Sequence, residues 1–351
     1  MSPVRPILVV GCARSGTTML QLMLHAHPRI AIGSETRFVL EGYRARREFG
    51  DLAVEANRRR LAEWIVRRRA TAVADLGLDA DALVEAIVAA PPTLGSAFGT
   101  VFRSYAQRFG KPRWGDKRPA YIDNLDVLLR LFPTAQIVAI LRDGRDCVAS
   151  LKEMHWHRGG TPEAAAAWAR AVDTAAAAAR ELGADTFHQV RYEDLVRDPT
   201  GTLRRVCAFL GEEYDAAMAE PARIAATAVP EKKTWHRRTR EAVSDARIGS
   251  WRQRLTPEEI ALCQAALGRR LAELGYPPPD VPLARPPLAT LTSYRLVAGR
   301  RRLSRAGRRF RDSGAPARDA ASLADHGAPA QTRPGWRNSP RATSASSDAR
   351  R

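Results

Sequence analysis

The 351-residue sequence lacks the usual features of membrane and secreted proteins. It has no run of about 18 apolar residues, the length that a membrane-spanning helix needs. Its first apolar run, residues 7–10, is too short for the core of a signal peptide. Its four cysteines are far apart and form no CxxC pair, which argues against a disulfide framework or a zinc site. We therefore expect a cytoplasmic protein whose cysteines are small core residues, namely Cys12, Cys147, Cys207 and Cys263.

Negative charge is scarce, and the imbalance is greatest near the C-terminus. The formal net charge is +18, and residues 291–351 contribute +10 of it through 14 Arg and 4 Asp. From about Arg311 this segment is rich in Ser, Ala, Pro, Gly and Arg and poor in large apolar residues, so we expect a largely disordered basic tail over 291–351. We favour a solubilising role for this tail over nucleic-acid binding, while peripheral contact with an anionic membrane stays open.

The first 290 residues alternate between two kinds of pattern. Continuous apolar runs predict buried strands, and apolar stripes at a spacing of three to four residues predict helices. The predicted strands lie in residues 6–11, 30–34, 136–141 and 187–195, and the main predicted helices lie in residues 17–27, 122–132, 161–183 and 199–211. This alternation indicates a single α/β domain with a P-loop-type parallel sheet flanked by helices. Residues 50–110 are helical in pattern throughout and predict an inserted helical layer.

The stretch "VVGCARSGTTML", residues 9–20, follows the first predicted strand and leads into a helix. A turn of this kind forms an anion site from backbone N–H groups and the positive end of the helix dipole. Gly11 and Gly16 have the spacing of a phosphate loop, but Thr17 stands where NTPases have a Lys. The cation of the loop is Arg14 instead. The hydroxyl donors of the loop are Ser15, Thr17 and Thr18.

A second departure from the NTPase pattern follows the strand at 136–141. Arg142 stands there, with no clear acidic residue to hold Mg²⁺. We infer a phosphorylated ligand that is not a magnesium-bound triphosphate undergoing hydrolysis. Arg142 and Ser150, at the start of the following helix, suit a second phosphate group. Two phosphate subsites far apart suggest a nucleotide phosphorylated at its 5′ and 3′ positions.

Four segments in the right order resemble the sulfotransferases that use 3′-phosphoadenosine 5′-phosphosulfate (PAPS). They are "GCARSGTTML", "GDKRPAYIDNLDVLLRLFPTAQIVAILRDGRDCVAS", "VRYEDLVRDP" and "IGSWRQRL". The stretches "RSGTTMLQLMLHAHPRIAIGSETR" and "LGYPP" are most similar to the tyrosylprotein sulfotransferase branch and its bacterial relatives. The resemblance covers roughly residues 6–278, apart from the helical insert.

For the donor, the resemblance implies a nucleotide held at several points. Arg14 would contact the 5′-phosphate and the leaving group, and Arg142 with Ser150 would hold the 3′-phosphate. Tyr192 would lie near the adenine. The "GSW" segment would cover the nucleotide, with Trp251 at its aromatic position. Gly249 stands where the tyrosylprotein enzymes have a different small residue. The loop residues carried over are Arg14, Ser15, Gly16, Thr17 and Thr18.

For catalysis, the resemblance implies one carboxylate and two cations, and no metal. Glu35 matches the base of the tyrosylprotein branch, a role that the chemistry requires because an attacking hydroxyl must lose its proton. Arg37 matches a neighbouring active-site arginine. Lys117 matches a lysine that stabilises charge developing on the leaving oxygen, and Arg14 would assist it.

The sequence therefore predicts transfer of a sulfuryl group from PAPS to an acceptor hydroxyl. A P-loop kinase or another nucleotide-dependent transferase is one alternative, and a basic nucleic-acid or membrane-surface protein is another. We expect the acceptor pocket between the sheet edge and the helical insert. Peptide tyrosine, a glycan, a lipid and a small natural product stay open as acceptors, and the apolar insert leans slightly toward a small or lipid-like one.

Overall fold

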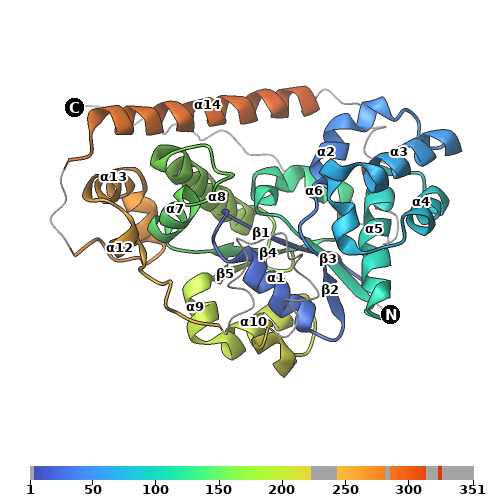
Figure 1. The fold of residues 1–351 in the computed structure, drawn as a ribbon, viewed down its shortest axis with the longest axis horizontal. Coiled ribbons are helices and arrows are strands. Elements are labelled where there is room, and N and C mark those ends of the chain that lie inside the picture. The colour runs from blue at the N-terminus through green and yellow to red at the C-terminus, as the bar shows by residue number, and fades with distance from the viewer. Residues whose placement is uncertain (1–3, 223–242, 281–284, 314–322, 326–351) are drawn as a thin grey trace, which may run out of the picture.

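A computed structural model describes residues 4–222, 243–280, 285–313 and 323–325. Its centre is a five-stranded parallel sheet in the order β2-β3-β1-β4-β5 (Figure 1). The strands are β1 (Ile7–Gly11), β2 (Ile30–Ile32), β3 (Arg113–Lys117), β4 (Gln136–Leu141) and β5 (Phe187–Arg191). The predicted α/β fold is confirmed, and because all strands are parallel, their carboxyl ends meet at one edge of the sheet.

Strand β3 is absent from the sequence prediction. Its sequence, RWGDK, has no apolar run, although every residue in it is buried. The polar side chains are buried because each meets a specific partner. Arg113 donates to the Leu210 carbonyl at 2.7 Å, for example, and Lys117 donates to Glu35 at 3.1 Å. A buried strand with paired polar groups has no apolar pattern that would reveal it.

Helices cover both faces of the sheet because side chains of a strand point alternately to either side. Ile7 and Val9 pack in the cluster formed with α1 (Thr17–Ala26), α9 (Tyr192–Arg197) and α10 (Pro199–Leu210). Leu8 and Val10 belong to the larger cluster on the opposite face. The helices that contribute to this second cluster include α6 (Leu125–Leu131), α7 (Gly144–Lys152) and α8 (Thr161–Glu181) (Figure 1).

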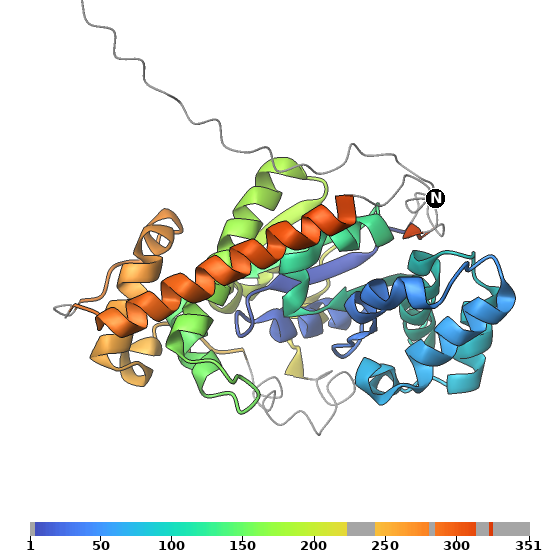
Figure 2. The ribbon, with the colours of Figure 1, turned by 90° about the horizontal axis from the view of Figure 1, so that it is seen from above.

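The predicted helical insert exists and packs beside the β2–β3 edge (Figures 1 and 2). Its helices are α2 (Phe38–Ala45), α3 (Glu55–Arg67), α4 (Ala80–Ala89) and α5 (Leu94–Arg108), joined by short 3-10 turns. Aromatic rings join it to the sheet: Phe102 of α5 stacks on Trp114 of β3 with centroids 5.2 Å apart, and Phe38 of α2 stacks on Phe102 at 5.3 Å. The insert therefore shares one hydrophobic core with the sheet.

The C-terminal region departs from the expected tail. After α12 (Trp251–Arg254) and α13 (Pro257–Glu273), residues Leu288–Ser313 form a helix, α14, which lies against α8 and α13 (Figure 2). Tyr294 anchors it by packing against the core. Residues 291–313 of the expected tail are therefore helical, whereas the disorder expected from about Arg311 falls mainly on residues 314–322 and 326–351, which lie outside the described residues.

Two smaller expectations can be compared with the described residues. The four cysteines are free and buried, as predicted. Within the described part of the chain, no helix combines the length and the apolar character needed to cross a bilayer.

Candidate active site

The predicted site residues follow the carboxyl ends of successive strands. Arg14 follows β1, Glu35 follows β2, Lys117 ends β3, Arg142 follows β4 and Tyr192 follows β5. Parallel pairing places these positions along one edge, with Val9 of β1 in register with Lys117 of β3, for example. The edge borders a cleft of about 1450 Å³. Its lining includes Arg14, Gly16, Thr17, Thr18, Glu35, Arg37, Arg142, Ser150 and Tyr192.

The loop between β1 and α1 is held in a conformation that needs its two glycines. A Cβ on Gly11 would lie 2.5 Å from the carbonyl oxygen of Ile140, and one on Gly16 would lie 2.6 Å from the Tyr192 ring. Gly16 also has a φ of +102° and Arg14 a φ of +71°, a backbone region that side chains other than glycine rarely occupy. Strain of this kind is typical of ligand-binding loops.

The loop hydroxyls divide into two groups. Ser15 is fully buried and donates to the Cys12 carbonyl at 2.7 Å, so its side chain closes the loop and does not line the cleft. Thr17 and Thr18 begin α1 and line the cleft. No side chain caps the N-terminus of α1, which suits it to an anion.

Arg14, Ser150 and Arg142 form a connected cluster on the β4 side of the loop. Arg14 Nε donates to Ser150 Oγ at 3.0 Å, and Arg142 donates to the Arg14 carbonyl at 3.3 Å. The Arg142 guanidinium lies over the Tyr192 ring, 4.3 Å from its centroid. The predicted subsites for the 5′- and 3′-phosphates are therefore neighbours, and Arg14 contacts residues of both. Their residues are nevertheless far apart in the sequence.

The electrostatics of this cluster favour an anionic ligand. Burial and the positive charge of Arg142 both lower the pKa of Arg14. Arg142 is only 6% exposed, and its buried Nε has no hydrogen-bond partner among the described residues. An unpaired buried donor costs free energy, and a phosphate oxygen would satisfy it. These residues fit a nucleotide with more than one phosphate group.

Glu35 and Lys117 meet on the other side of the loop. Lys117 Nζ donates to Glu35 Oε2 at 3.1 Å and to Thr18 Oγ1 at 3.3 Å. Arg118 Nε lies 3.9 Å from Glu35 Oε1. Lys117 is almost fully buried, whereas the Glu35 side chain is 32% exposed to the cleft. The pair thus places an accessible carboxylate and a fixed ammonium beside the loop.

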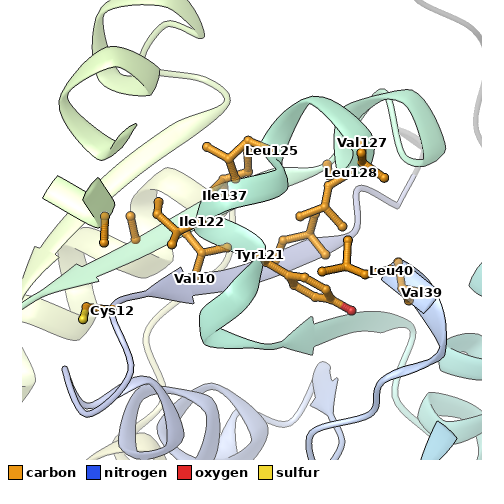
Figure 3. Packing of buried hydrophobic residues seen from close by; sticks show 14 of the residues in the cluster. Val10, Cys12, Val39, Leu40, Tyr121, Ile122, Leu125, Val127, Leu128 and Ile137 are labelled. Carbon is orange, nitrogen blue, oxygen red and sulfur yellow. The ribbon is translucent and has the colours of Figure 1, made fainter. Parts of the chain in front are cut away.

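Asp116 supports this pair and was missed by the sequence prediction. Its carboxylate accepts hydrogen bonds from the Lys117 amide at 2.8 Å and from the Tyr121 hydroxyl. Figure 3 shows Tyr121 between Val10 of β1 and Leu40 of α2, which fixes its ring. Burial raises the pKa of Asp116 to about 6. The signal was its position next to Lys117 in "GDK", which no periodicity reveals.

The "GSW" segment is well anchored but does not reach the cleft lining. The Asp146 carboxylate accepts from the amides of Gly249 at 2.8 Å and Trp251 at 2.9 Å. Trp251 is 1% exposed and packs against the Arg145 guanidinium, 4.3 Å from the ring centroid. The preceding Arg247 lines the cleft instead, and its carbonyl accepts from Arg142 at 2.6 Å. Sequence reasoning missed Arg247.

The insert side of the cleft carries exposed charges. Arg37 is exposed there, as is Arg69 of the insert. Asp123 and Arg170 form a bidentate pair at 2.7 and 2.9 Å across the same cleft. Apart from Arg37, none of these was predicted individually. Across the described ranges, no group of three or more His, Cys, Asp or Glu residues is placed to hold a metal ion.

Comparison with known proteins points to one family. A sequence model described as the sulfotransferase family matches residues 6–216. The chain is 25% identical to the protein-tyrosine sulfotransferase of Drosophila melanogaster, over 60% of this chain and 39% of that protein. It is 30% identical to the nodulation protein NoeE of Sinorhizobium fredii, over 76% of this chain and 65% of that protein. The chain thus spans well under two thirds of the Drosophila protein.

Among solved structures, a similar fold is that of the sulfotransferase domain from the Synechococcus PCC 7002 olefin synthase. The TM-score is 0.54 at 24% identity, and the match covers 80% of this chain and 97% of that domain. The family match includes the phosphate loop and every strand of the sheet. The chain therefore belongs to the sulfotransferase family, a family of enzymes.

Proposed function

We propose that this enzyme transfers a sulfuryl group from PAPS to an acceptor hydroxyl. The observation that carries the proposal is that Lys117 donates hydrogen bonds to both Glu35 and Thr18 at the phosphate loop. A carboxylate, an ammonium and a loop hydroxyl meet where a donor on the loop and an acceptor in the cleft would come together. Such an arrangement supplies a base and a cation beside a transferring group.

The donor-binding residues are those of the loop and of the cluster beside it. Thr17, Thr18 and the N-terminal amides of α1 would hold the 5′-phosphosulfate. Arg142 and Ser150 would hold the 3′-phosphate, and this phosphate would give the unpaired Arg142 Nε an acceptor. The PAPS donor supplies an activated sulfuryl group, so the protein needs only to position, deprotonate and stabilise.

In the proposed reaction, Glu35 accepts the proton of the acceptor hydroxyl. The acceptor oxygen forms a bond to sulfur while the bond from sulfur to the bridging phosphate oxygen breaks. Lys117 and Arg14 stabilise the charge that develops on that bridging oxygen. The products are a sulfate ester and adenosine 3′,5′-bisphosphate. Asp116 holds the end of β3 and thereby positions Lys117.

The donor half is tested by titration calorimetry on the full chain. Adenosine 3′,5′-bisphosphate should bind more tightly than Mg-ATP, and Arg142→Ala should abolish most of the preference for the bisphosphate over adenosine 5′-monophosphate. If Mg-ATP binds more tightly than the bisphosphate, a kinase-like function is favoured and the proposal is wrong.

The acceptor half is tested with ³⁵S-labelled PAPS and separate acceptor panels of tyrosine peptides, glycans, lipids and phenolic natural products. The names of the relatives make tyrosine peptides the first panel to assay. We expect labelled product from one panel with the wild-type chain, and little with Glu35→Gln. Near-normal turnover by Glu35→Gln would assign the base to another residue.

A further inference from the structure

A short segment from the C-terminal region, Leu323–Asp325, lies on helix α5 of the insert (Figure 2, small red segment). The Asp325 carboxylate accepts from Arg103 Nη1 at 2.8 Å and from Ser96 Oγ at 3.3 Å. Thr93, the N-cap of α5, donates from its hydroxyl to the Ala324 carbonyl at 2.7 Å. Both the backbone and the acidic side chain of the segment are therefore recognised.

The surface of α5 is shaped to receive this segment. A Cβ on Gly95 would lie 2.5 Å from the Asp325 amide nitrogen, and a Cβ on Gly99 would lie 2.6 Å from Asp325 Oδ2. The two glycines are four residues apart, so they lie on one face of the helix and together admit the segment. Any larger residue at either position would push the segment away.

The ends of the segment are buried as well. Leu323 is 7% exposed and borders a pocket of about 330 Å³ whose lining includes Phe49, Leu52 and Leu94. Asp325 is 9% exposed. A buried aliphatic side chain packed in the hydrophobic core, followed two residues later by a paired carboxylate, is a specific pattern of peptide recognition.

The segment also bridges the α-helices that precede and follow β3 in the chain. While its carboxylate is bound to α5, the Asp325 amide donates to the carbonyl of Leu131, the last residue of α6, at 2.8 Å. Trp114 of β3 packs between Phe102 of α5 and Phe132, which follows α6, with centroids 5.2 and 5.3 Å away. The segment therefore connects the two helices, α5 and α6, that precede and follow strand β3, which carries Asp116 and Lys117.

We propose that this surface is a peptide-binding site, separate from the cleft, whose ligand is the chain's own Leu-Ala-Asp segment. The ligand class is a short peptide with an aliphatic residue two positions before an Asp. Bound in this way, the segment ties the C-terminal region to the insert and holds α5 against α6. The effective concentration of a tethered ligand is high, so the site is filled without a free peptide.

The first test is hydrogen exchange, followed by mass spectrometry on the full chain. Asp325→Arg reverses the bound charge, and we expect exchange at residues 323–325 and at the first turn of α5 to rise about tenfold or more. Arg103→Asp should do the same, and the double variant should recover part of the protection. Asp319→Arg makes the same charge change elsewhere in the C-terminal region and should leave exchange on α5 unchanged. Equal effects of Asp325→Arg and Asp319→Arg would overturn the proposal.

The second test supplies the ligand as a separate molecule and does not depend on the fold of the Arg103 variant. A fluorescent peptide of residues 321–327 should bind full-length Asp325→Arg more tightly than wild type, whose site is already filled. The same peptide with Asp325→Ala is the matched control. If both peptides bind Asp325→Arg equally, or if neither binds, the surface is not the site proposed here.

Discussion

The two sides of the cleft are built differently. On the loop side, Arg142 and Ser150 are buried; Arg142 donates to the Arg247 carbonyl and lies over the Tyr192 ring, and Ser150 accepts from Arg14. On the insert side, Arg37 and Arg69 are exposed. A buried polar network tolerates one ligand geometry because every unmet bond is costly, whereas exposed charges are adaptable and weak. Under the proposed function, the donor would therefore be recognised by fixed geometry and the acceptor by an adaptable surface.

The largest effect is expected at Glu35, which lies between the two sides. Glu35→Gln keeps the shape but removes the base, so kcat should fall by about 10² to 10⁴. Binding of adenosine 3′,5′-bisphosphate, measured by calorimetry, should change little. Glu48→Gln, an exposed carboxylate of the insert that does not line the cleft, is the control and should retain activity. A parallel loss of nucleotide binding in Glu35→Gln would place this residue on the donor side instead.

The next effect concerns the fixed geometry of the loop side. Arg142→Ala removes a buried guanidinium, and the affinity for adenosine 3′,5′-bisphosphate should fall by about 10- to 100-fold, on the scale of a charge-assisted hydrogen bond. Arg142→Lys should restore only part of the loss because an ammonium lacks the planar fork. Arg180→Ala, an exposed arginine at the end of α8, should bind normally. Full recovery of the affinity in Arg142→Lys would mean that charge alone, and not the geometry of the guanidinium, determines binding.

The next prediction concerns Asp116, whose carboxylate accepts a hydrogen bond from the Lys117 amide. Its raised pKa makes the stability of the protein depend on pH. Its pKa is raised from 3.8 to about 6 by burial, so between about pH 4 and 6 the folded state binds this proton more tightly than the unfolded state. This group therefore contributes to the free energy of unfolding at low pH. That contribution is lost as the pH rises to about 6, and the loss is on the order of 2 to 3 kcal/mol.

Asp116→Asn removes this titration, so its stability relative to wild type should improve from pH 4 to pH 7 in urea unfolding. Tyr121→Phe removes a hydrogen bond that lowers the pKa of Asp116 and should move the transition to higher pH. A constant difference between Asp116→Asn and wild type at all pH values would contradict this reading.

A glycine pair separates backbone strain from close packing on the loop side. Gly16 and Gly110 both have positive φ values, +102° and +62°, but a Cβ on Gly110 would meet nothing within 4 Å. Each change to Ala costs roughly 1 to 2 kcal/mol from its backbone conformation. Gly16→Ala should cost about 1 to 3 kcal/mol more, since its Cβ would displace the Tyr192 ring. Thermal unfolding of the two variants measures this difference, and equal costs would show that the ring yields freely.

The same contrast explains what could be predicted from the sequence. The loop side depends on motifs in which neighbouring residues share one role, so the sequence alone predicts Arg14, Thr17 and Arg142 as site residues, and all three line the cleft. Strand β3 could not be predicted, because its polar residues are hydrogen-bonded to partners distant in the sequence, such as Glu35 for Lys117. Helix α14 could not be predicted, because its Arg-rich composition is typical of a disordered segment. Only the structure shows that Tyr294 packs against the core. The residues on the insert side of the cleft could not be predicted from the sequence, since exposed charged residues follow no spacing rule.

The smallest effect is expected on the insert side. Arg69→Ala removes an exposed charge from the cleft, so the KM for the acceptor should change about fivefold or less, on the scale of a surface ion pair. The change should shrink at high salt, because exposed charges are screened. Arg67→Ala, an exposed arginine that pairs with Asp81 outside the cleft lining, is the matched control and should leave the KM unchanged. A salt-independent loss of tenfold or more at Arg69 would show that the acceptor, too, is recognised by fixed geometry.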